Sequence, residues 1–199
     1  MSFARKAAES GVDGLVLVGA GAGGHTGPIS GFAFVAEVRR FWDGPIALAG
    51  ALGDGRAVRA AEVLGADLAY MGTRFVAARE SLVADAYREM LVAAGAEDIV
   101  LTDAITGVKA NFLIPSLEAS GYDPKNLTPK GSIDFGGDPQ DERKAWKHLW
   151  AAGHGVGATR RIQTVAEIAA EIGAEYEAAV SDGHAANIWT DGKRGRRAA

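Results

Sequence analysis

The residues whose types and spacing could carry chemistry gather between Gly19 and Gly27, a glycine-rich stretch that contains His25. Glycine lacks a Cβ, so its backbone adopts positive φ and can lie against a flat or phosphorylated ligand. His25 is the one titratable side chain of this stretch, and an imidazole titrates near neutral pH, as a general base must. Two interpretations follow: a flexible crossover with a surface histidine, or a ligand site with a base.

The residues around these glycines argue against two common nucleotide motifs. A P-loop needs a lysine after its glycines, and none follows here. A dinucleotide fingerprint matches by letter at Gly19, Gly21 and Gly24. However, Thr26-Gly27-Pro28 is a poor first turn for a phosphate-binding helix, and no acidic residue ends a second strand about 20 residues further on. Neither motif accounts for the stretch.

Short apolar runs alternate with helical patterns through the first half of the chain. Residues 15–18, 45–49 and 67–71 predict buried strands, and residues 2–10, 34–42 and 55–64 predict helices. Cap residues bound the helices: Gly11 and Gly65 at C-terminal ends, and Asp54 at an N-terminal end. In the second helix the apolar residues share one stripe: Phe34, Val35, Val38, Phe41 and Trp42. This alternation favours parallel strands joined by right-handed crossovers.

Parallel neighbours would bring three loops together at the carboxyl ends of these strands. The loops are Gly19 to Gly27, Gly50 to Gly55 and Gly72 to Arg74. If the three strands belong to a parallel α/β barrel, these loops have a known use. Such barrels commonly bind phosphate after their last two strands, with backbone N–H groups as donors. We therefore expect a phosphate site at Gly50, Ala51, Gly72 and Thr73.

The second half of the chain is less regular. We expect Ser81 to cap a helix that carries Tyr87, residues 99–102 to form a short strand, and the segment to residue 137 to form loops and one short helix. Asp138-Pro139 predicts the start of a helix over 139–152, and Thr164 with Glu167 forms a capping box for a last helix over 165–180. His148, on the first of these helices, has no second ligand at metal spacing, so no metal site is predicted.

Composition bounds the class of protein. The chain has 199 residues, 48% of them hydrophobic, which fits one domain with a sizeable core. The absence of cysteine excludes disulfides and thiolate chemistry and fits a reducing compartment. The sequence also has no apolar run long enough to span a membrane. We therefore expect a cytoplasmic protein. The net charge of −4 does not suggest a nucleic-acid partner, and residues 181–199 form a basic segment that we expect to be a disordered tail.

Four segments together resemble a known family. They are Ala22-Gly23-Gly24-His25-Thr26-Gly27, the run Pro45 to Ala51, Leu64-Gly65-Ala66-Asp67 and Met71-Gly72-Thr73-Arg74-Phe75. In order and spacing they are similar to the C-terminal half of nitronate monooxygenases, the FMN enzymes formerly called 2-nitropropane dioxygenases. The resemblance implies an α/β fold over residues 1–180: the C-terminal part of a TIM (β/α)8 barrel with about three parallel strands, followed by C-terminal helices.

The resemblance also implies a chemistry and a cofactor. It implies an enzyme that uses FMN and O2 to oxidise alkyl nitronates or nitroalkanes to a carbonyl compound and nitrite. His25 matches the family's general base, which takes the α-proton of a neutral nitroalkane, and Ala51 stands where the family has the second glycine of its phosphate loop. The residues implied to hold the cofactor are Gly23, Gly24, Gly50, Ala51, Tyr70, Met71, Gly72 and Thr73. The segment from Ala152 to Gly157 resembles a late glycine-rich segment near the family's active site.

Two other functions remain open at this stage. A flavin-dependent enoyl-acyl-carrier-protein reductase shares the glycine-histidine loop but needs a nicotinamide donor. Alternatively, the chain is a non-catalytic piece or one part of a split enzyme, because three strands cannot close a barrel and their edges would expose unpaired backbone groups. We therefore also expect self-association or a complementing N-terminal half-barrel as partner.

Overall fold

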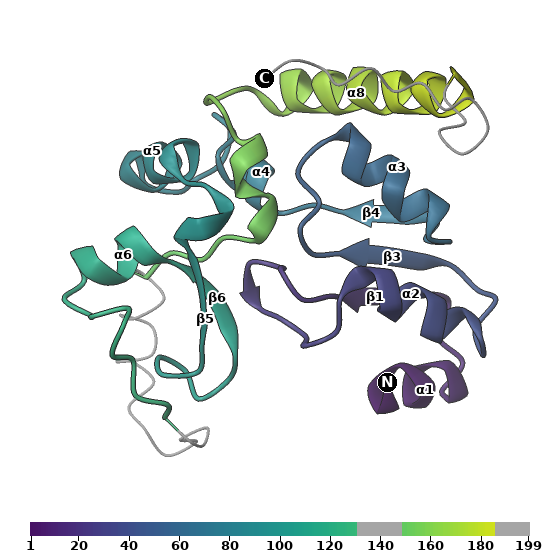
Figure 1. The fold of residues 1–199 in the computed structure, drawn as a ribbon, viewed down its shortest axis with the longest axis horizontal. Helices are drawn as coiled ribbons and strands as arrows, with labels where there is room; N and C mark the ends of the chain where they lie inside the picture. The colour runs from purple at the N-terminus through teal and green to yellow at the C-terminus, as the bar shows by residue number, and fades with distance from the viewer. Residues whose placement is uncertain (131–148, 186–199) are drawn as a thin grey trace, which may run out of the picture.

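A parallel sheet forms one half of the molecule. The computed structural model describes residues 1–130 and 149–185, and in it β1 (Leu15–Val18), β3 (Ile46–Ala49) and β4 (Leu68–Tyr70) pair in parallel in the order β1-β3-β4 (Figure 1). In the register, Leu15 lies opposite Ile46, and Ala47 lies opposite Leu68. The prediction of three parallel strands is confirmed.

Helices α1 (Ser2–Glu9), α2 (Gly31–Arg39) and α3 (Gly55–Val63) alternate with these strands, as predicted. Val35 and Val38 of α2 are fully buried, and they pack in one cluster with Leu17 and Ile46 of the sheet. Asp54 caps α3, because its carboxylate accepts a hydrogen bond from the Ala57 N–H at 2.8 Å. The apolar stripe of α2 is therefore core packing, as its spacing indicates.

The opposite face of the parallel sheet is open to solvent. Along β1, Leu15 and Leu17 are buried, whereas the alternate residues Val16 and Val18 are 56% and 39% exposed. On β4, which lies at the other edge, Leu68 is 62% and Tyr70 is 61% exposed. A strand presents alternate side chains to opposite faces, so these four apolar side chains share one face with Ala47 and Ala49. We define Val16, Val18, Leu68 and Tyr70 as the open sheet face; none of them belongs to a buried core cluster among the described residues.

A small antiparallel sheet forms the other half. It consists of β2 (Gly24–His25), β6 (Ala110–Leu113) and β5 (Ile99–Thr102), in the order β2-β6-β5. The short helix η1 (Ala96–Asp98) directly precedes β5, and α6 (Ile114–Ala119) directly follows β6. The sequence predicts β5 and the short helix but neither β2 nor β6. All four residues of β6 are buried, so the strand shows no polar alternation that could reveal it.

Two further helices carry the chain past the sheet. After α4 (Thr73–Val76), helix α5 (Asp85–Ala93) begins with Ala84 as its N-cap, so the prediction that Ser81 caps this helix is wrong. Ser81 lies instead in a turn: its N–H donates to the Ala78 carbonyl, and its own carbonyl accepts from the Arg88 guanidinium. The side chain of Arg88 thereby occupies the Ser81 carbonyl, which would accept the first intrahelical hydrogen bond if Ser81 were the N-cap.

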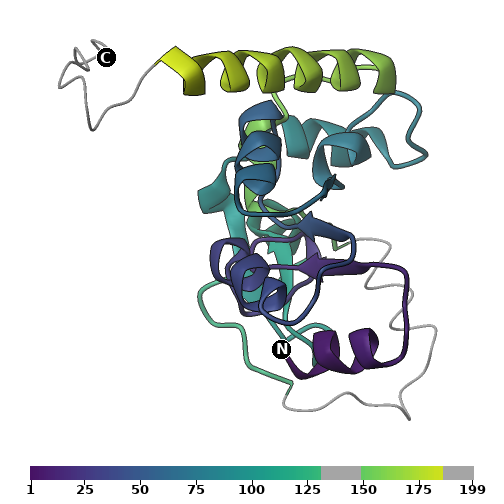
Figure 2. The same cartoon turned by 90° about the vertical axis from the view of Figure 1, so that its right-hand side faces the viewer.

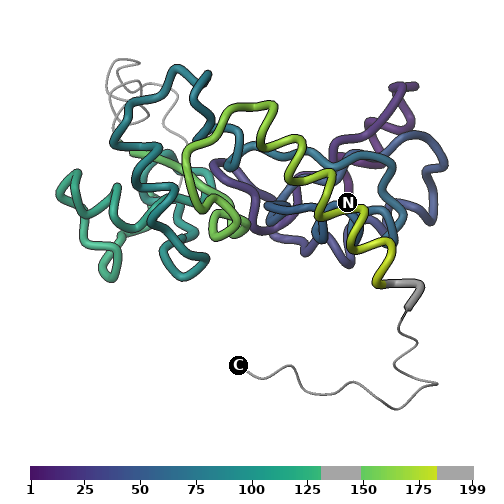
Figure 3. The backbone as a smooth tube through the Cα atoms, turned by 90° about the horizontal axis from the view of Figure 1, so that it is seen from above, coloured from purple at the N-terminus to yellow at the C-terminus, as the bar shows by residue number. Residues whose placement is uncertain are grey.

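Helix α8 (Val165–Ala185) follows η2 (His154–Ala158) and runs along one end of the molecule, opposite α1 (Figure 2). Seen from above, it extends over the half that carries the parallel sheet (Figure 3). The predicted capping box is confirmed: Thr164 N–H donates to the Glu167 carboxylate at 2.7 Å, and Glu167 N–H donates to the Thr164 hydroxyl at 3.2 Å. None of the helices in the described ranges is long and apolar enough to cross a bilayer.

Two predicted segments fall largely outside the described residues. These are the start of the helix over 139–152, including His148, and residues 186–199 of the basic tail. The described end of that helix is extended rather than helical: Ala151 bridges Phe112 in antiparallel fashion, and the Leu113 N–H donates to the Trp150 carbonyl at 2.9 Å. Residues 181–185 continue α8.

Candidate functional site

A cleft of about 360 Å³ opens at the carboxyl ends of the three parallel strands. Its wall is formed by the three loops that the sequence brings to one mouth, together with residues 151–155 from just before and within η2. The predicted site residues in this wall are Gly23, Gly24, His25, Gly50, Ala51, Tyr70, Gly72 and Thr73. Met71 lies elsewhere, in a hollow between β4 and α8 that it shares with Ile172.

The floor of the cleft is made by backbone packed directly against backbone. The Gly21 carbonyl accepts hydrogen bonds from Ala51 N–H at 3.1 Å and from His154 N–H at 2.9 Å. A Cβ at Gly153 would lie 2.6 Å from the Gly21 oxygen, and one at Gly23 would lie 2.7 Å from the Gly153 nitrogen. Glycines in the first loop are thus required by contact between loops, independently of any ligand. The Ala51 N–H, in particular, already has a partner.

The loop after β3 uses a rare backbone conformation. Gly50 has φ of +115°, and a Cβ there would lie 2.8 Å from the Gly19 carbonyl oxygen. Ala51 has φ of +60° and is the one non-glycine residue in the left-handed region across the described residues. This conformation costs an L-residue about 1–2 kcal/mol. The chain therefore keeps a backbone turn suited to glycine although residue 51 is alanine.

The loop after β4 presents a hydroxyl and an open backbone. Thr73 Oγ1 accepts a hydrogen bond from the Gly153 N–H at 3.0 Å, which leaves the hydroxyl hydrogen able to donate to a ligand. A Cβ built on Gly72 would meet nothing within 4 Å, so the backbone at this glycine faces open space. Gly72 and Thr73 together can receive an anionic group at the wall of the cleft.

His25 reaches the cleft from the second sheet, on β2. This strand pairs His25 with Ala110 of β6, and the side chain is exposed. Its neighbour Thr26 is fixed twice: the hydroxyl donates to the Gly19 carbonyl at 2.9 Å, and the N–H donates to the Lys109 carbonyl at 3.3 Å. The second sheet, which sequence patterns did not predict, therefore holds the candidate base in place.

Tyr87 also lines the cleft. Its place in the sequence indicates only a position on the apolar stripe of a helix, which it shares with Val83, Met90, Leu91 and Ala94. Its hydroxyl donates to the Ala151 carbonyl, and its ring stacks on Trp150 with centroids 4.9 Å apart. Burial raises the pKa of Tyr87 to about 12, so the phenol stays neutral through the physiological range. A hydroxyl on an otherwise apolar stripe is the one signal that could have marked it.

Arg74 does not point into the cleft. Its guanidinium is 3% exposed and lies against α8, where Nη2 is 3.1 Å from the Glu171 carboxylate and Nη1 donates to the Gly53 carbonyl at 3.0 Å. Arg74 therefore supplies no charge to the cleft wall and instead joins the loop after β3 to α8.

Part of the sequence is similar to curated proteins. A nitronate monooxygenase of Paraburkholderia phytofirmans is 34% identical over 129 residues, which cover 60% of this chain and 35% of that protein. A (3aS,4S,5R,7aS)-5-hydroxy-7a-methyl-1-oxo-octahydro-1H-indene-4-carboxyl-CoA dehydrogenase of Rhodococcus jostii is 35% identical over 122 residues, with 59% of this chain and 35% of that protein covered. The matched region thus spans about a third of each curated relative.

Solved structures share the fold. FabK from Thermotoga maritima superimposes with a TM-score of 0.73 at 30% identity, covering 92% of this chain and 60% of that one. Nitroalkane oxidase from Streptomyces ansochromogenes does so with a TM-score of 0.70 at 25% identity, covering 90% and 56%. With its parallel sheet and crossover helices, the chain has the α/β fold of a partial (β/α)8 barrel.

The sequence model of one family, nitronate monooxygenase, matches residues 1–175. This span includes every residue of the cleft wall, from Val18 to Gly155. The order of motifs, the cleft at the strand ends and this match agree, and the chain belongs to the nitronate monooxygenase family.

Proposed function

We propose that this chain contributes the phosphate-binding and proton-accepting side of an FMN-dependent nitronate monooxygenase. The reaction would oxidise alkyl nitronates or nitroalkanes with O2 to a carbonyl compound and nitrite. The observation that carries the proposal is that His25, Gly50 and Thr73, which lie far apart in the sequence, line one cleft. A base and a phosphate wall in one cleft are what a flavin enzyme that removes a carbon-bound proton needs.

The residues in the cleft fit a phosphorylated flavin. The glycine floor lets a flat ring approach the backbone, and Gly72 and Thr73 offer an open backbone and a hydroxyl donor for the phosphate. Gly50 belongs to the same proposed phosphate wall. Bound FMN would supply the redox chemistry, taking electrons from the nitronate and passing them to O2. Ala51 N–H donates to Gly21, so we assign Ala51 a role in shaping the loop rather than in donating to phosphate.

His25 is proposed to accept the α-proton of a neutral nitroalkane. A neutral imidazole nitrogen can accept this proton once the substrate is held in the cleft. The exposed position of His25 at the mouth allows proton exchange with solvent. A substrate that arrives already ionised as a nitronate has no such proton to lose and depends less on His25.

A second candidate is a flavin-dependent enoyl reductase, favoured by the likeness to FabK. The two reactions differ in their electron donors, which gives a direct test. The chain, together with any complementing partner, is incubated with FMN, and oxygen consumption with an alkyl nitronate is compared with NADH oxidation in the presence of an enoyl thioester. Nitronate-dependent oxygen consumption is the expected result. NADH turnover without nitronate activity would reverse the assignment.

The open sheet face supports a partner for the whole activity. The four apolar side chains of this face lie on β1 and β4, the two edge strands of the parallel sheet. The outer edges of these strands pair with no other strand among the described residues. We propose that a complementing half-barrel, or a second copy of the chain, covers this face before full catalysis. Gel filtration combined with a flavin absorption spectrum tests this: a well-folded monomer that binds FMN and turns over nitronate alone would contradict it.

A further inference from the structure

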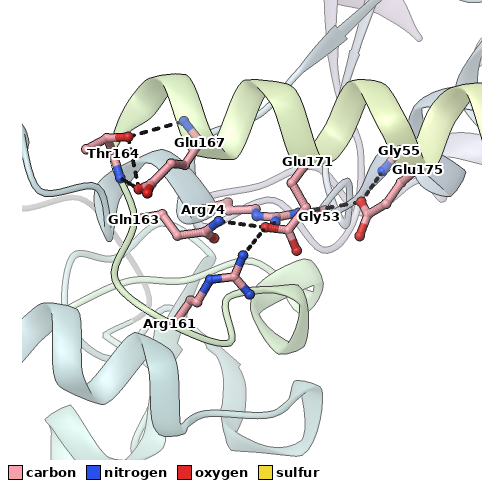
Figure 4. Close-up of polar contacts among 9 residues, drawn as sticks. All are labelled: Gly53, Gly55, Arg74, Arg161, Gln163, Thr164, Glu167, Glu171 and Glu175. Atoms are coloured by element: carbon pink, nitrogen blue, oxygen red, sulfur yellow. Dashed lines mark hydrogen bonds and ion pairs between the residues drawn. The ribbon is translucent and has the colours of Figure 1, made fainter.

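Arg74 occupies a buried position where three parts of the chain meet. Its side chain is 3% exposed, and it contacts the β3–α3 loop and two carboxylates of α8 (Figure 4). Nη1 donates to the Gly53 carbonyl at 3.0 Å, Nη2 lies 3.1 Å from Glu171, and Nη1 lies 3.7 Å from Glu175. Because Arg74 directly follows Thr73, this contact set begins one residue from the proposed phosphate wall.

The α8 carboxylates hold the same loop from its other end. The Glu175 carboxylate accepts the Gly55 N–H, the first amide of α3, at 2.9 Å. A negative charge there is favoured by the dipole of α3. A Cβ at Gly55 would lie 2.2 Å from the Tyr176 nitrogen, so α3 and α8 touch backbone to backbone at this point. Gly53 and Gly55, two and four residues beyond Ala51, are thereby fixed just after the left-handed turn at Gly50 and Ala51.

Glu171 is itself oriented by two further donors. The Gln163 amide donates to its carboxylate at 2.6 Å, and the Arg161 guanidinium donates at 3.0 Å (Figure 4). The resulting network runs from Gln163 through Glu171 and Arg74 to Gly53. It links α8, which lies outside the cleft, to the loops after β3 and β4 that line it.

From this network we propose that Arg74 is a positioning residue for the phosphate end of the flavin site. The proposal rests on the proposed flavin function. Arg74 touches no ligand; it fixes the loop from Gly50 to Gly55 relative to Thr73, so that Gly50 and Thr73 face the same anion. The planar guanidinium is required because its donors reach a carbonyl and two carboxylates at once, which the single ammonium of lysine does not.

A second arginine offers a matched control. Arg39 donates to the Gly65 carbonyl at 2.8 Å and to the Gly44 carbonyl at 2.7 Å, and it pairs with Asp67 at 2.6 Å. These residues precede β3 and β4, so Arg39 joins loops at the end of the sheet away from the cleft. It makes the same kinds of contact as Arg74 without contacting a cleft loop.

The test compares Arg74→Lys with Arg39→Lys in the full chain. FMN and riboflavin, which lacks the phosphate, are titrated by quenching of flavin fluorescence at a temperature where both variants are folded. We expect Arg74→Lys to weaken FMN binding at least about tenfold, as loss of charge-assisted hydrogen bonds does, and to leave riboflavin binding within about twofold. Arg39→Lys should change neither affinity. Equal loss for FMN and riboflavin, or equal loss in both variants, would overturn the proposal.

Two further measurements keep the test decisive. If Arg74→Lys does not fold, Glu175→Gln takes its place, and it should weaken FMN binding selectively because it loosens the same loop. In the flavin-free protein, amide hydrogen exchange over residues 50–55 should rise in the Arg74 or Glu175 variant and not in Arg39→Lys; unchanged exchange there contradicts the role of Arg74. Failure of the wild-type chain to bind either flavin would contradict the proposed function, and the exchange result still decides on Arg74.

Discussion

The hydroxyl of Thr73 and the backbone N–H of Gly153 are joined by a 3.0 Å hydrogen bond across 80 residues of chain. The bond ties the loop after β4 to the segment that precedes η2, and both line the cleft. The segment is also held by Tyr87, whose hydroxyl donates to the carbonyl of Ala151. The cleft wall is thus closed by contacts between parts of the chain that are remote in sequence.

Replacing Thr73 by valine keeps the shape of the side chain but removes this acceptor. The Gly153 N–H then lacks a protein partner, and the free energy of unfolding should fall by about 1–3 kcal/mol. FMN binding should weaken more than riboflavin binding, because the hydroxyl is the proposed phosphate donor. Urea titrations and flavin fluorescence measure the two effects, and Thr73→Ser should restore both. A serine variant as weak as the valine variant would show that the methyl group matters instead.

Replacing His25 by asparagine removes the proposed base while keeping a polar side chain. Turnover of neutral nitroalkanes should fall by about 10²–10⁴-fold, the usual contribution of a general base. Turnover of pre-ionised nitronate and the affinity for FMN should change little, since the proposed phosphate residues lie in other loops. Steady-state oxygen consumption with the two substrate forms, on the chain with any complementing partner, measures the difference. Equal loss for both forms would assign His25 to substrate positioning.

Replacing Ala51 by glycine should not destabilise the protein, contrary to the usual effect of glycine. Relief of a left-handed alanine gains about 1–2 kcal/mol, and the added freedom of the unfolded chain costs about 0.5–1 kcal/mol. The control is Ala60→Gly, at an exposed interior position of α3, which should cost about 1 kcal/mol. Chemical denaturation compares the two. A loss at Ala51 as large as that at Ala60 would contradict the backbone conformation described.

Glu171 should make the protein sensitive to acid. The hydrogen bond from the Gln163 amide, followed by the charges of Arg74 and Arg161, lowers the pKa of Glu171 below its ordinary value of 4.5. A lowered pKa in the folded state means that the ionised carboxylate stabilises the fold above that ordinary value, and that this stabilisation is lost as pH falls through the folded-state pKa. The stability gap between wild type and Glu171→Gln should therefore be constant from pH 7 to about 5 and narrow below it. Urea midpoints across this range would show it, and a gap that does not narrow in acid would refute the assignment.

Local sequence patterns predict the parallel half of the fold well. The strands at 15–18, 45–49 and 67–71 and the caps at Asp54, Gly65 and Thr164 follow from backbone preferences that act over a few residues. The cleft follows in turn, because parallel strands place their carboxyl ends at one edge. Which residues bind a ligand there stays a prediction.

The antiparallel half depends on contacts that local patterns do not contain. Strand β2 has two residues, and only its pairing with β6 defines it. Within buried β6, Asn111 reads as a strand breaker, yet its amide donates to the Ala22 carbonyl at 2.8 Å. The buried contacts of Arg74 could not be predicted either, because an arginine after Gly-Thr suggests a phosphate ligand, whereas its partners Glu171 and Glu175 come about a hundred residues later.

The glycine floor also determines which positions of the cleft can be mutated without disturbing the fold. Where main-chain atoms of different loops lie within contact of one another, as at Gly23 and Gly153, any side chain forces the loops apart. A saturation library at these positions would yield mostly misfolded variants. Side chains that line the same cleft and are not fully buried are the places to diversify, and they include those of Leu52 and Val76. The walls of this cleft can therefore change by substitution, whereas its floor cannot change without a change in how the loops pack.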